Sequence, residues 1–264
     1  MRRGFAIPAT EDLERAQEIA ARVERLGYSS IWSNDTPGAD GIVTAAAMAD
    51  ASDRLRVGVG VVAVHRRPPQ EIAEVVRELE IPLDRLVLGV GSGSSPTPIR
   101  AVREAVAALR DLLGPDLRIG VAAMGPQMCR LAGEVADTVL LNWMVPERIE
   151  WAKARVAQGA KRSGRYGVPE LACYVRCAIG DGAVDRVAAE AAKYNGYPAY
   201  TRHFTAMGVP LAGVGVTDHS GDYTSRLADY DSVLDEVVVR ALPESESVTS
   251  TLAVAEASAP VNRT

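Results

Sequence analysis

The chain has 264 residues, of which 47% are hydrophobic and only 5% aromatic, and its formal net charge at pH 7 is −5. This length is typical of one α/β barrel and allows a large aliphatic core. The negative charge argues against a nucleic-acid partner and against binding to an anionic membrane surface. No apolar run approaches the roughly 20 residues that a membrane helix needs. The first expected strand begins too early for a secretory signal, so we expect a cytoplasmic protein.

The three cysteines do not follow the pattern of a disulfide or of a metal site. Cys173 and Cys177 lie in one predicted strand, where four steps of about 3.3 Å hold their Cα atoms too far apart for a disulfide. An odd number of cysteines suits a reducing compartment. The spacing is not that of a zinc site and the three histidines are scattered, so no metal is expected.

Strand-like and helix-like segments alternate almost from end to end. Eight short β-rich runs are each followed by a helical pattern, which implies a parallel sheet with right-handed crossovers. Eight such units in a chain of this length favour a closed (β/α)8 TIM barrel over a doubly wound sheet. The predicted strands are Arg3–Ile7, Ser30–Ser33, Arg56–Val64, Arg85–Val90, Leu117–Ala123, Thr138–Asn142, Leu171–Ile179 and Glu236–Ala241.

Helix ends are marked by capping residues, prolines and glycines. The first helix has apolar residues at i, i+3 and i+4, with Thr10 as its N-cap, Glu11 and Asp12 in its first turn and Gly27 as its stop. Later helices begin at prolines. We expect a single barrel domain over residues 1–264, with a frayed tail over about 259–264. The stretch from Thr205 to Asp235 is long for a connection, which indicates a short helix or an active-site lid.

Sites in such barrels form at the C-terminal ends of the strands and in the loops that follow. This rule selects one loop after each strand from the second to the sixth. The loops are Asn34–Thr36, His65–Arg67, Gly91–Ser95, Met124–Gln127 and Asn142–Met144.

Three glycine-containing segments each allow more than one interpretation. Gly89–Ser94 lacks the third glycine of a dinucleotide fingerprint, and it either approaches a flat ligand or is a flexible turn. Gly125 lies where a strand runs into a helix, so it either exposes backbone N–H groups to an anion or forms a tight turn. Gly58 and Gly60 interrupt a buried strand, which indicates a flat ligand, a bulge, or room for neighbouring side chains.

Four segments, in this order, look like those of the luciferase-like monooxygenase superfamily. They are GYSSIWSND at Gly27–Asp35, VGVGVVAVH at Val57–His65, LGVGSG at Leu88–Gly93 and GPQMCRLAGEVAD at Gly125–Asp137. The last most resembles the branch that uses the deazaflavin coenzyme F420. Gly159–Gly164 and a helix over Tyr194–Gly208 are similar too, so the resemblance covers nearly the whole chain.

The resemblance implies a cofactor-binding role for nine residues. One would lie beside the polar edge of the deazaflavin ring, two would form a bulge with a non-proline cis peptide behind one ring face, and one would contact the ring nearby. Two would lie near the ring or its side chain, and three would hold the cofactor phosphate. In that order, the residues are Asp35; Gly60 and Val61; Ala63; Gly93 and Thr97; and Met124, Gly125 and Gln127.

The sequence departs from the sugar-phosphate dehydrogenases of this family. Those relatives carry an Asp-His pair after the second strand and a Glu in the loop after the fourth as base and acid. Thr36 and Ser94 occupy these positions here, and neither titrates near neutral pH. Oxidation of a sugar alcohol is therefore not expected. The candidate proton donors are Asn34 through an ordered water, Thr36 and His65.

The sequence thus predicts an oxidoreductase that transfers a hydride between an F420-type cofactor and a small organic substrate. The substrate would stack on the ring face opposite Gly60 and Val61. One alternative is an FMN-dependent monooxygenase supplied with reduced flavin by a partner reductase, and another is a cofactor-binding protein without catalysis. The small, apolar segment Ile42–Ala49 also suggests a homodimer, although such a face can equally pack on its own barrel.

Overall fold

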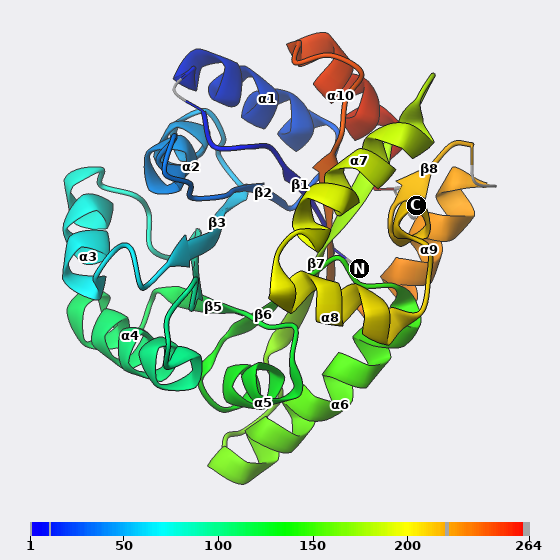
Figure 1. The fold of residues 1–264 in the computed structure, drawn as a ribbon. Coiled ribbons are helices and arrows are strands. Elements are labelled where there is room, and N and C mark those ends of the chain that lie inside the picture. Colours follow the sequence, from blue (N-terminus) through cyan, green and yellow to red (C-terminus); the bar gives the residue numbers. More distant parts are fainter. Residues whose placement is uncertain (1, 11, 220–221, 261–264) are drawn as a thin grey trace.

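Eight parallel strands close into a barrel in the computed structural model, which describes residues 2–10, 12–219 and 222–260 (Figure 1). Pairings β1–β9, β7–β9 and β6–β7 complete the ring. The predicted (β/α)8 barrel is confirmed, and each predicted strand bound is correct to within one residue. The ring strands are β1 (Arg2–Ala6), β2 (Ser30–Ser33), β3 (Arg56–Ala63), β4 (Leu86–Gly91), β5 (Arg118–Ala122), β6 (Thr138–Asn142), β7 (Glu170–Ala178) and β9 (Glu236–Ala241).

Helices surround the ring of strands, and α7 and α8 are drawn across the side formed by β7 (Figure 1). Many of them begin at a proline, as the sequence predicts. The helices are α1 (Leu13–Arg25), α2 (Gly41–Asp50), α3 (Pro69–Glu78), α4 (Pro98–Leu113), α5 (Pro126–Val135), α6 (Pro146–Ser163), α7 (Ala183–Asn195), α8 (Pro198–Met207), α9 (Tyr223–Val233) and α10 (Val248–Ala257).

Two helix predictions need correction. The N-cap of α1 is Asp12 rather than Thr10, because the Asp12 carboxylate accepts the Arg15 N–H at 3.0 Å. Thr10 instead accepts the Asp12 N–H, and Glu11 lies outside the described residues. The predicted helix over Tyr194–Gly208 is two helices, since Pro198 lacks an N–H and starts α8 after α7 has ended.

The long stretch before the last strand contains regular structure. It holds the 3₁₀ helix η1 (Leu211–Val214), the two-residue strand β8 (Val216–Thr217) and α9. β8 pairs with Cys177 and Ala178, where β7 extends beyond its partner β6. The predicted short helix is therefore present as η1 and α9. Of the predicted tail, residues 261–264 lie outside the described part of the chain.

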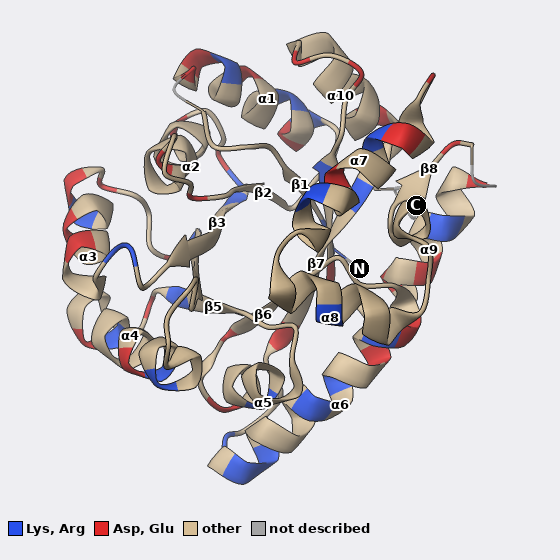
Figure 2. Ribbon diagram, in the orientation of Figure 1, with Lys and Arg blue, Asp and Glu red and all other residues tan. Residues whose placement is uncertain are grey.

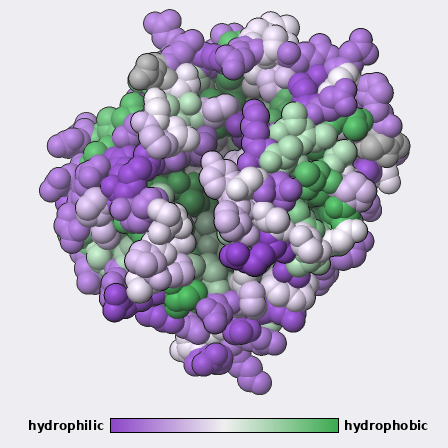
Figure 3. Space-filling view, viewed as in Figure 1, coloured by the Kyte–Doolittle hydropathy of each residue, from purple (hydrophilic) through white to green (hydrophobic). Residues whose placement is uncertain are grey.

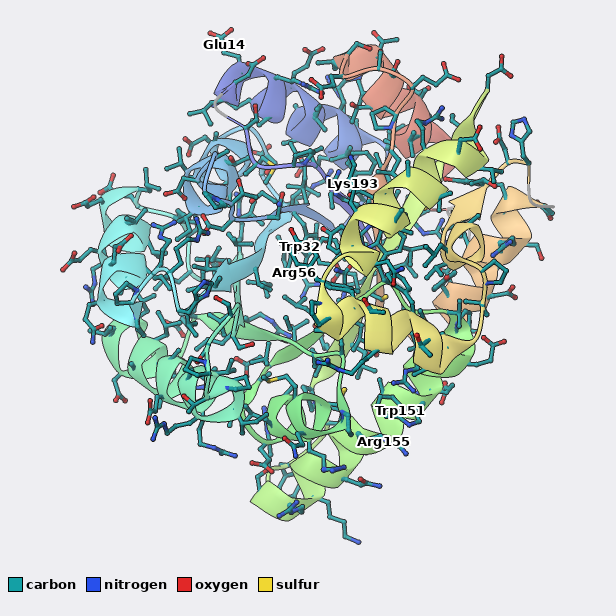
Figure 4. All side chains as sticks on the ribbon, in the orientation of Figure 1. Glu14, Trp32, Arg56, Trp151, Arg155 and Lys193 are labelled. Carbon is teal, nitrogen blue, oxygen red and sulfur yellow. The ribbon has the colours of Figure 1, made fainter. Side chains whose placement is uncertain are left out.

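Two aromatic rings fill the barrel interior where β3 carries its two glycines. A Cβ on Gly58 would lie 2.1 Å from the Trp32 ring, and one on Gly60 would lie 2.0 Å from the Tyr174 hydroxyl. The two rings meet edge to face with centroids 5.9 Å apart, and Trp32 lies at the centre of the barrel in Figure 4. The interpretation of these glycines as room for neighbouring side chains is the one that the packing supports.

Charged side chains pair with one another at the N-terminal end of the barrel. Glu236, at 2% exposure, lies 2.8 Å from Arg56, and Glu170 lies 2.7 Å from Arg2 and 2.8 Å from Arg118. Figure 4 shows Arg56 near the barrel axis. Each inward-facing carboxylate therefore has a guanidinium partner, as buried charges require.

Backbone contact between α5 and α6 fixes the direction of α5. A Cβ on Gly133 would lie 2.1 Å from the Val156 carbonyl oxygen, and one on Gly159 would lie 1.9 Å from the Arg130 carbonyl oxygen. Only glycines allow the two helices to approach this closely. The N-terminus of α5 is thereby held in place at the end of β5.

The apolar face of α2 is covered by its own chain. Ile42, Ala45 and Met48 are fully buried, and Figure 2 shows almost no charge on α2, whereas α3, α4 and α6 carry many charged residues. This packing removes the argument for a dimer interface on α2. None of the described helices has both the length and the hydropathy needed to cross a membrane.

We predict that Glu170→Gln lowers the free energy of unfolding by about 1–3 kcal/mol at neutral pH, because charged hydrogen bonds are lost. Burial raises the pKa of Glu170, but the hydrogen bond from Arg2 and the charges of Arg118, Arg2 and Arg56 outweigh it and leave the pKa below 4.5. This stabilisation is present above that pH and is lost as the pH falls through the folded-state pKa.

Urea denaturation at a series of pH values measures the effect. The difference between the parent protein and the variant should shrink as the pH is lowered below 4.5. Glu104→Gln on α4, where the carboxylate is 71% exposed, is the control and should show little difference at any pH. A difference for Glu170→Gln that stays constant down to acidic pH would contradict this assignment.

Candidate active site

The face of the molecule seen in Figure 3 is hollowed at its centre, and hydrophobic residues lie in the depth of the hollow. It lies over the ring of strands, with α7 and α8 on one side. Val61 is half-buried there against Leu140 and other interior residues. A Cβ on Gly91 would lie 2.8 Å from the Val61 side chain and 3.5 Å from Ala122. Small side chains thus leave an apolar floor at the C-terminal mouth.

β3 is irregular where it reaches the mouth. Its register with β4 shifts between Val59 and Val62, and the Gly60–Val61 peptide bond is cis. The bulge and the cis bond that the resemblance implies are both present. Val61 turns toward the glycines of β4, while Gly60 lies against Tyr174. The cofactor-binding roles of Gly60 and Val61 stay predictions.

Three of the predicted site residues come together at the ends of β3 and β4. Gly93 has a φ of +54°, and a Cβ there would lie 1.9 Å from His65 Nδ1 and 3.1 Å from the Ala63 Cβ. The exposed His65 ring therefore lies over Gly93. Thr97 is the exposed N-cap of α4, and its N–H donates to the Ser95 hydroxyl at 3.2 Å.

Asp35 is the anchor of an ion-pair network between the loops after β2 and β3. Its carboxylate is 1% exposed and accepts from Arg66, from Arg67 at 3.2 Å and from the Gly41 N–H at 3.1 Å. Burial lowers the pKa of Arg67, but the charges of Asp40, Asp35 and Glu71 outweigh it and raise the pKa. Asp35 thus fixes these loops at the rim of the mouth, beside a cavity of about 560 Å³.

Asn34 and Thr36 are engaged in local structure. The Asn34 side-chain oxygen accepts the Ala9 N–H at 3.1 Å, and the Thr36 hydroxyl accepts the Ala39 N–H at 3.1 Å. Among the described residues, no hydrogen bond joins Asn34, Thr36 and His65. The three candidate proton donors therefore do not form one connected group.

The N-terminus of α5 offers unpaired backbone donors at the end of β5. Gly125 is the N-cap, no side chain caps the helix, and a Cβ at Gly125 would meet no atom within 4 Å. Gln127 is exposed in the first turn and Met124 is half-buried before it. The first-turn N–H groups and the helix dipole favour an anion here.

Sequence reasoning missed a polar cluster at the ends of β6, β7 and β9. Arg176, at 3% exposure, donates to the Asn142 side-chain oxygen. The Asn142 amide nitrogen donates to the Tyr200 hydroxyl at 2.9 Å, and burial raises the pKa of Tyr200 to about 12. Tyr174 is buried, and its hydroxyl has no hydrogen-bond partner within the part of the chain that the structure describes. Arg240 lies beside Arg176 on β9.

A signal for this cluster was present in the sequence. Arg176 and Arg240 each follow an apolar run near the C-terminal end of a strand, ACYV and VVV. Alternation along the strand places each on the same face as the inward-pointing residue two positions before it. Burying an arginine at an interior position near the mouth costs free energy, so its presence there indicates a functional role.

A second small core covers this side of the mouth. Trp143 lies between the rings of Tyr194 and Phe204, at centroid distances of 5.5 and 5.8 Å. His203 bonds the Trp143 carbonyl oxygen at 2.7 Å, and burial lowers the pKa of His203, so its ring is neutral. His203 therefore serves packing. Within the described ranges, no cluster of three His, Cys, Asp or Glu side chains is placed to hold a metal ion.

The family described as luciferase-like monooxygenase matches residues 1–248 of this chain. A 5,10-methylenetetrahydromethanopterin reductase of Methanolobus tindarius is 27% identical over 209 residues, which are 65% of this chain and 64% of that protein. The chain thus spans slightly less than two thirds of that relative's length.

Two solved structures share the fold. An F420-dependent secondary alcohol dehydrogenase, in complex with an F420-acetone adduct, has a TM-score of 0.77, 16% identity and 97% coverage of both chains. The oxygenating constituent of 3,6-diketocamphane monooxygenase from Pseudomonas putida, in complex with FMN, has a TM-score of 0.70 and 12% identity. It covers 98% of this chain and 97% of that one.

We predict that Gly60→Ala destabilises the protein by about 1–3 kcal/mol through overpacking against Tyr174. In a Tyr174→Phe background the cost should be smaller, since the hydroxyl is the nearest atom to the new Cβ. Thermal unfolding of the four proteins of this double-mutant cycle measures the coupling.

Gly213→Ala is the control, because its Cβ would meet only Pro210, at 4.0 Å. Strictly additive costs for Gly60→Ala and Tyr174→Phe would show that Gly60 does not accommodate the tyrosine. Additive costs would instead favour the interpretation that Gly60 is a glycine because a flat ligand packs against it.

Proposed function

This chain belongs to the luciferase-like monooxygenase family, and we propose that it is an F420-dependent oxidoreductase acting on a small organic substrate. The cofactor would lie in the mouth of the barrel, with its ring on the apolar floor beside β3. Its phosphate would lie at the N-terminus of α5. The substrate would approach from the side of β7.

The residues at the mouth fit such a cofactor. A flat ring suits the small side chains of Val61, Gly91 and Ala122, which form an apolar surface at the mouth. The open space around Gly125 and the uncapped first turn of α5 fit a phosphate. The buried Tyr174 hydroxyl has no hydrogen-bond partner among the described residues and would be available to a polar group of a ligand.

When bound, a deazaflavin supplies hydride chemistry at a ring carbon, and the protein supplies binding and orientation. The hydride and one proton would together saturate a double bond of the substrate. The backbone at Gly60 and Val61 would support one side of the pocket, and His65 over Gly93 would close its rim. α7 and α8 would limit the access of water from the side of β7.

The observation that carries this proposal is the uncapped α5 N-terminus at the edge of an apolar, open barrel mouth. Support also comes from the relatives, of which one is a methylenetetrahydromethanopterin reductase and one an F420-dependent alcohol dehydrogenase. The FMN-bound neighbour keeps flavin chemistry with a partner reductase as the second candidate. A homodimer stays a further proposal, and a mass near 28.0 kDa in light scattering would rule it out.

Titration of the purified protein with oxidised F420 and with FMN, followed by cofactor fluorescence, tests the proposal. We expect saturable F420 binding with FMN at least about tenfold weaker. Preferred FMN binding would indicate the flavin monooxygenase. F420 binding without hydride transfer to any carbonyl, imine or alkene tested would indicate a binding protein, and binding of neither cofactor would overturn the proposal.

We predict that Gly125→Val weakens cofactor binding by about tenfold or more, since a branched side chain would occupy the approach to the α5 amides. The melting temperature should change little, because the new side chain points into open space and the backbone is extended, with φ −93°. Gly213→Val serves as the control. A folded Gly125→Val protein with the parent's affinity would place the phosphate elsewhere.

A further inference from the structure

β7 and β9 carry opposite charges at their two ends. At the N-terminal end, Glu170 begins β7 and Glu236 begins β9, and both are paired with arginines. Near the C-terminal end, Arg176 and Arg240 are direct partners in the register of the two strands. Adjacent strands lie about 4.8 Å apart, so two like charges extend side by side toward the mouth. Like charges in directly opposite positions are destabilising.

No acidic side chain in the described ranges pairs with either arginine. Among the described residues, neither guanidinium forms an ion pair with a carboxylate. Arg176 is 3% exposed, and its Nε has no hydrogen-bond partner. Arg240 is half-buried and donates only to the Ala241 carbonyl oxygen, at 3.2 Å. Burial and the charge of Arg176 both lower the pKa of Arg240.

The groups around the pair do not supply the missing negative charge. Arg176 contacts the neutral Asn142 and lies over the Trp143 ring, 4.1 Å from its centroid. Glu190 on α7 acts on the Arg240 pKa from a distance, but its carboxylate lies 3.7 Å from Lys193. Figure 4 shows Lys193 on α7, near the centre of this face. The local field at this side of the mouth is therefore positive.

Position separates this pair from the expected cofactor phosphate. The phosphate site lies after β5, whereas Arg176 and Arg240 lie on β7 and β9, across the barrel from β3. Tyr174 spans the interior from β7 to the backbone of Gly60, and Arg176 follows it one pleat nearer the mouth. A ring lying beside β3 would thus have this arginine pair on its far side, where the proposed substrate would lie.

We propose that Arg176 and Arg240 bind an oxyanion of the substrate, so that the enzyme acts on small organic anions bearing a carboxylate or a phosphate. The inference rests on the proposed function for the reaction, but the anion site itself does not require the cofactor. Arg240 contributes one half-buried positive charge, and Arg176, its partner in the strand register, adds a second one held by Asn142 and Trp143. Two forked donors suit bidentate recognition of an oxyanion. The unpartnered Tyr174 hydroxyl lies next along the path toward the ring.

The test uses the full chain without cofactor, with succinate and inorganic phosphate as probes in separate calorimetric titrations. The variants are Arg240→Gln and Arg176→Gln. Arg100→Gln on α4, where the side chain is 71% exposed, changes the net charge equally. We expect the parent protein and Arg100→Gln to bind at least one probe. The two mouth variants should bind it at least about tenfold more weakly. Succinamide, the neutral analogue of succinate, should not bind.

Thermal unfolding and F420 titration of the same variants give two further readouts. Removing one of two unpaired like charges should leave the melting temperature unchanged or raise it, as expected where a binding site costs stability. F420 affinity should change less than probe affinity. If the parent protein binds an anion probe but does not bind F420, the proposed function is overturned and the anion site stands.

Three results would overturn the anion site as described. The first is that no probe binds the parent protein. The second is that Arg100→Gln weakens binding as much as the mouth variants, which would indicate a diffuse charge effect. The third is that Arg240→Gln loses F420 and probe affinity in parallel while F420 displaces the probe, which would assign the arginines to an anionic group of the cofactor.

Discussion

Closure of the parallel sheet forces every second residue of each strand into one narrow interior, and the other features of this protein follow from how that space is filled. Trp32 and Tyr174 occupy its middle, which is possible only because Gly58 and Gly60 carry no side chain opposite them. A barrel filled with aliphatic side chains alone would not need glycines at these two positions. The two rings separate the charged N-terminal end from the open C-terminal mouth.

Charge is handled differently at the two ends. Glu170 and Glu236 are compensated by arginines at the N-terminal end, since an uncompensated buried charge is costly. Arg176 and Arg240 lack such compensation at the end that opens to ligands. We expect the free energy of unfolding to be lower than that of a fully paired barrel, with the uncompensated charge at the end where a ligand would bind. This division fits the usual trade between stability and binding.

The fold could be predicted from the sequence because its signal is repeated. Each βα unit carries an apolar run, a cap and a proline or glycine boundary, so an error in one unit, such as Thr10 for Asp12 at the first cap, does not change the topology. The split between α7 and α8 was readable from Pro198 alone, since proline seldom continues a helix. A two-residue strand such as β8 has no periodicity to detect.

The candidate site could be predicted only in part, because loop geometry depends on contacts between segments far apart in the chain. Ala63, His65 and Gly93 do come together. The place of Asp35 beside a ring stays a prediction, and its ion pairs with Arg66 and Arg67 are contacts that no local pattern reveals. The arginine pair lies at interior positions within the strands, which the rule for loops at strand ends does not select.

Hydrogen–deuterium exchange of the parent protein with and without F420 tests the central claim most directly, since it locates the cofactor without any substitution. The account predicts slower exchange on F420 binding in residues 60–65, 91–97 and 124–128, with no change at the N-terminal end around Arg118 and Glu170. Protection confined to that opposite end, or no protection in the three mouth segments at saturating F420, would contradict it.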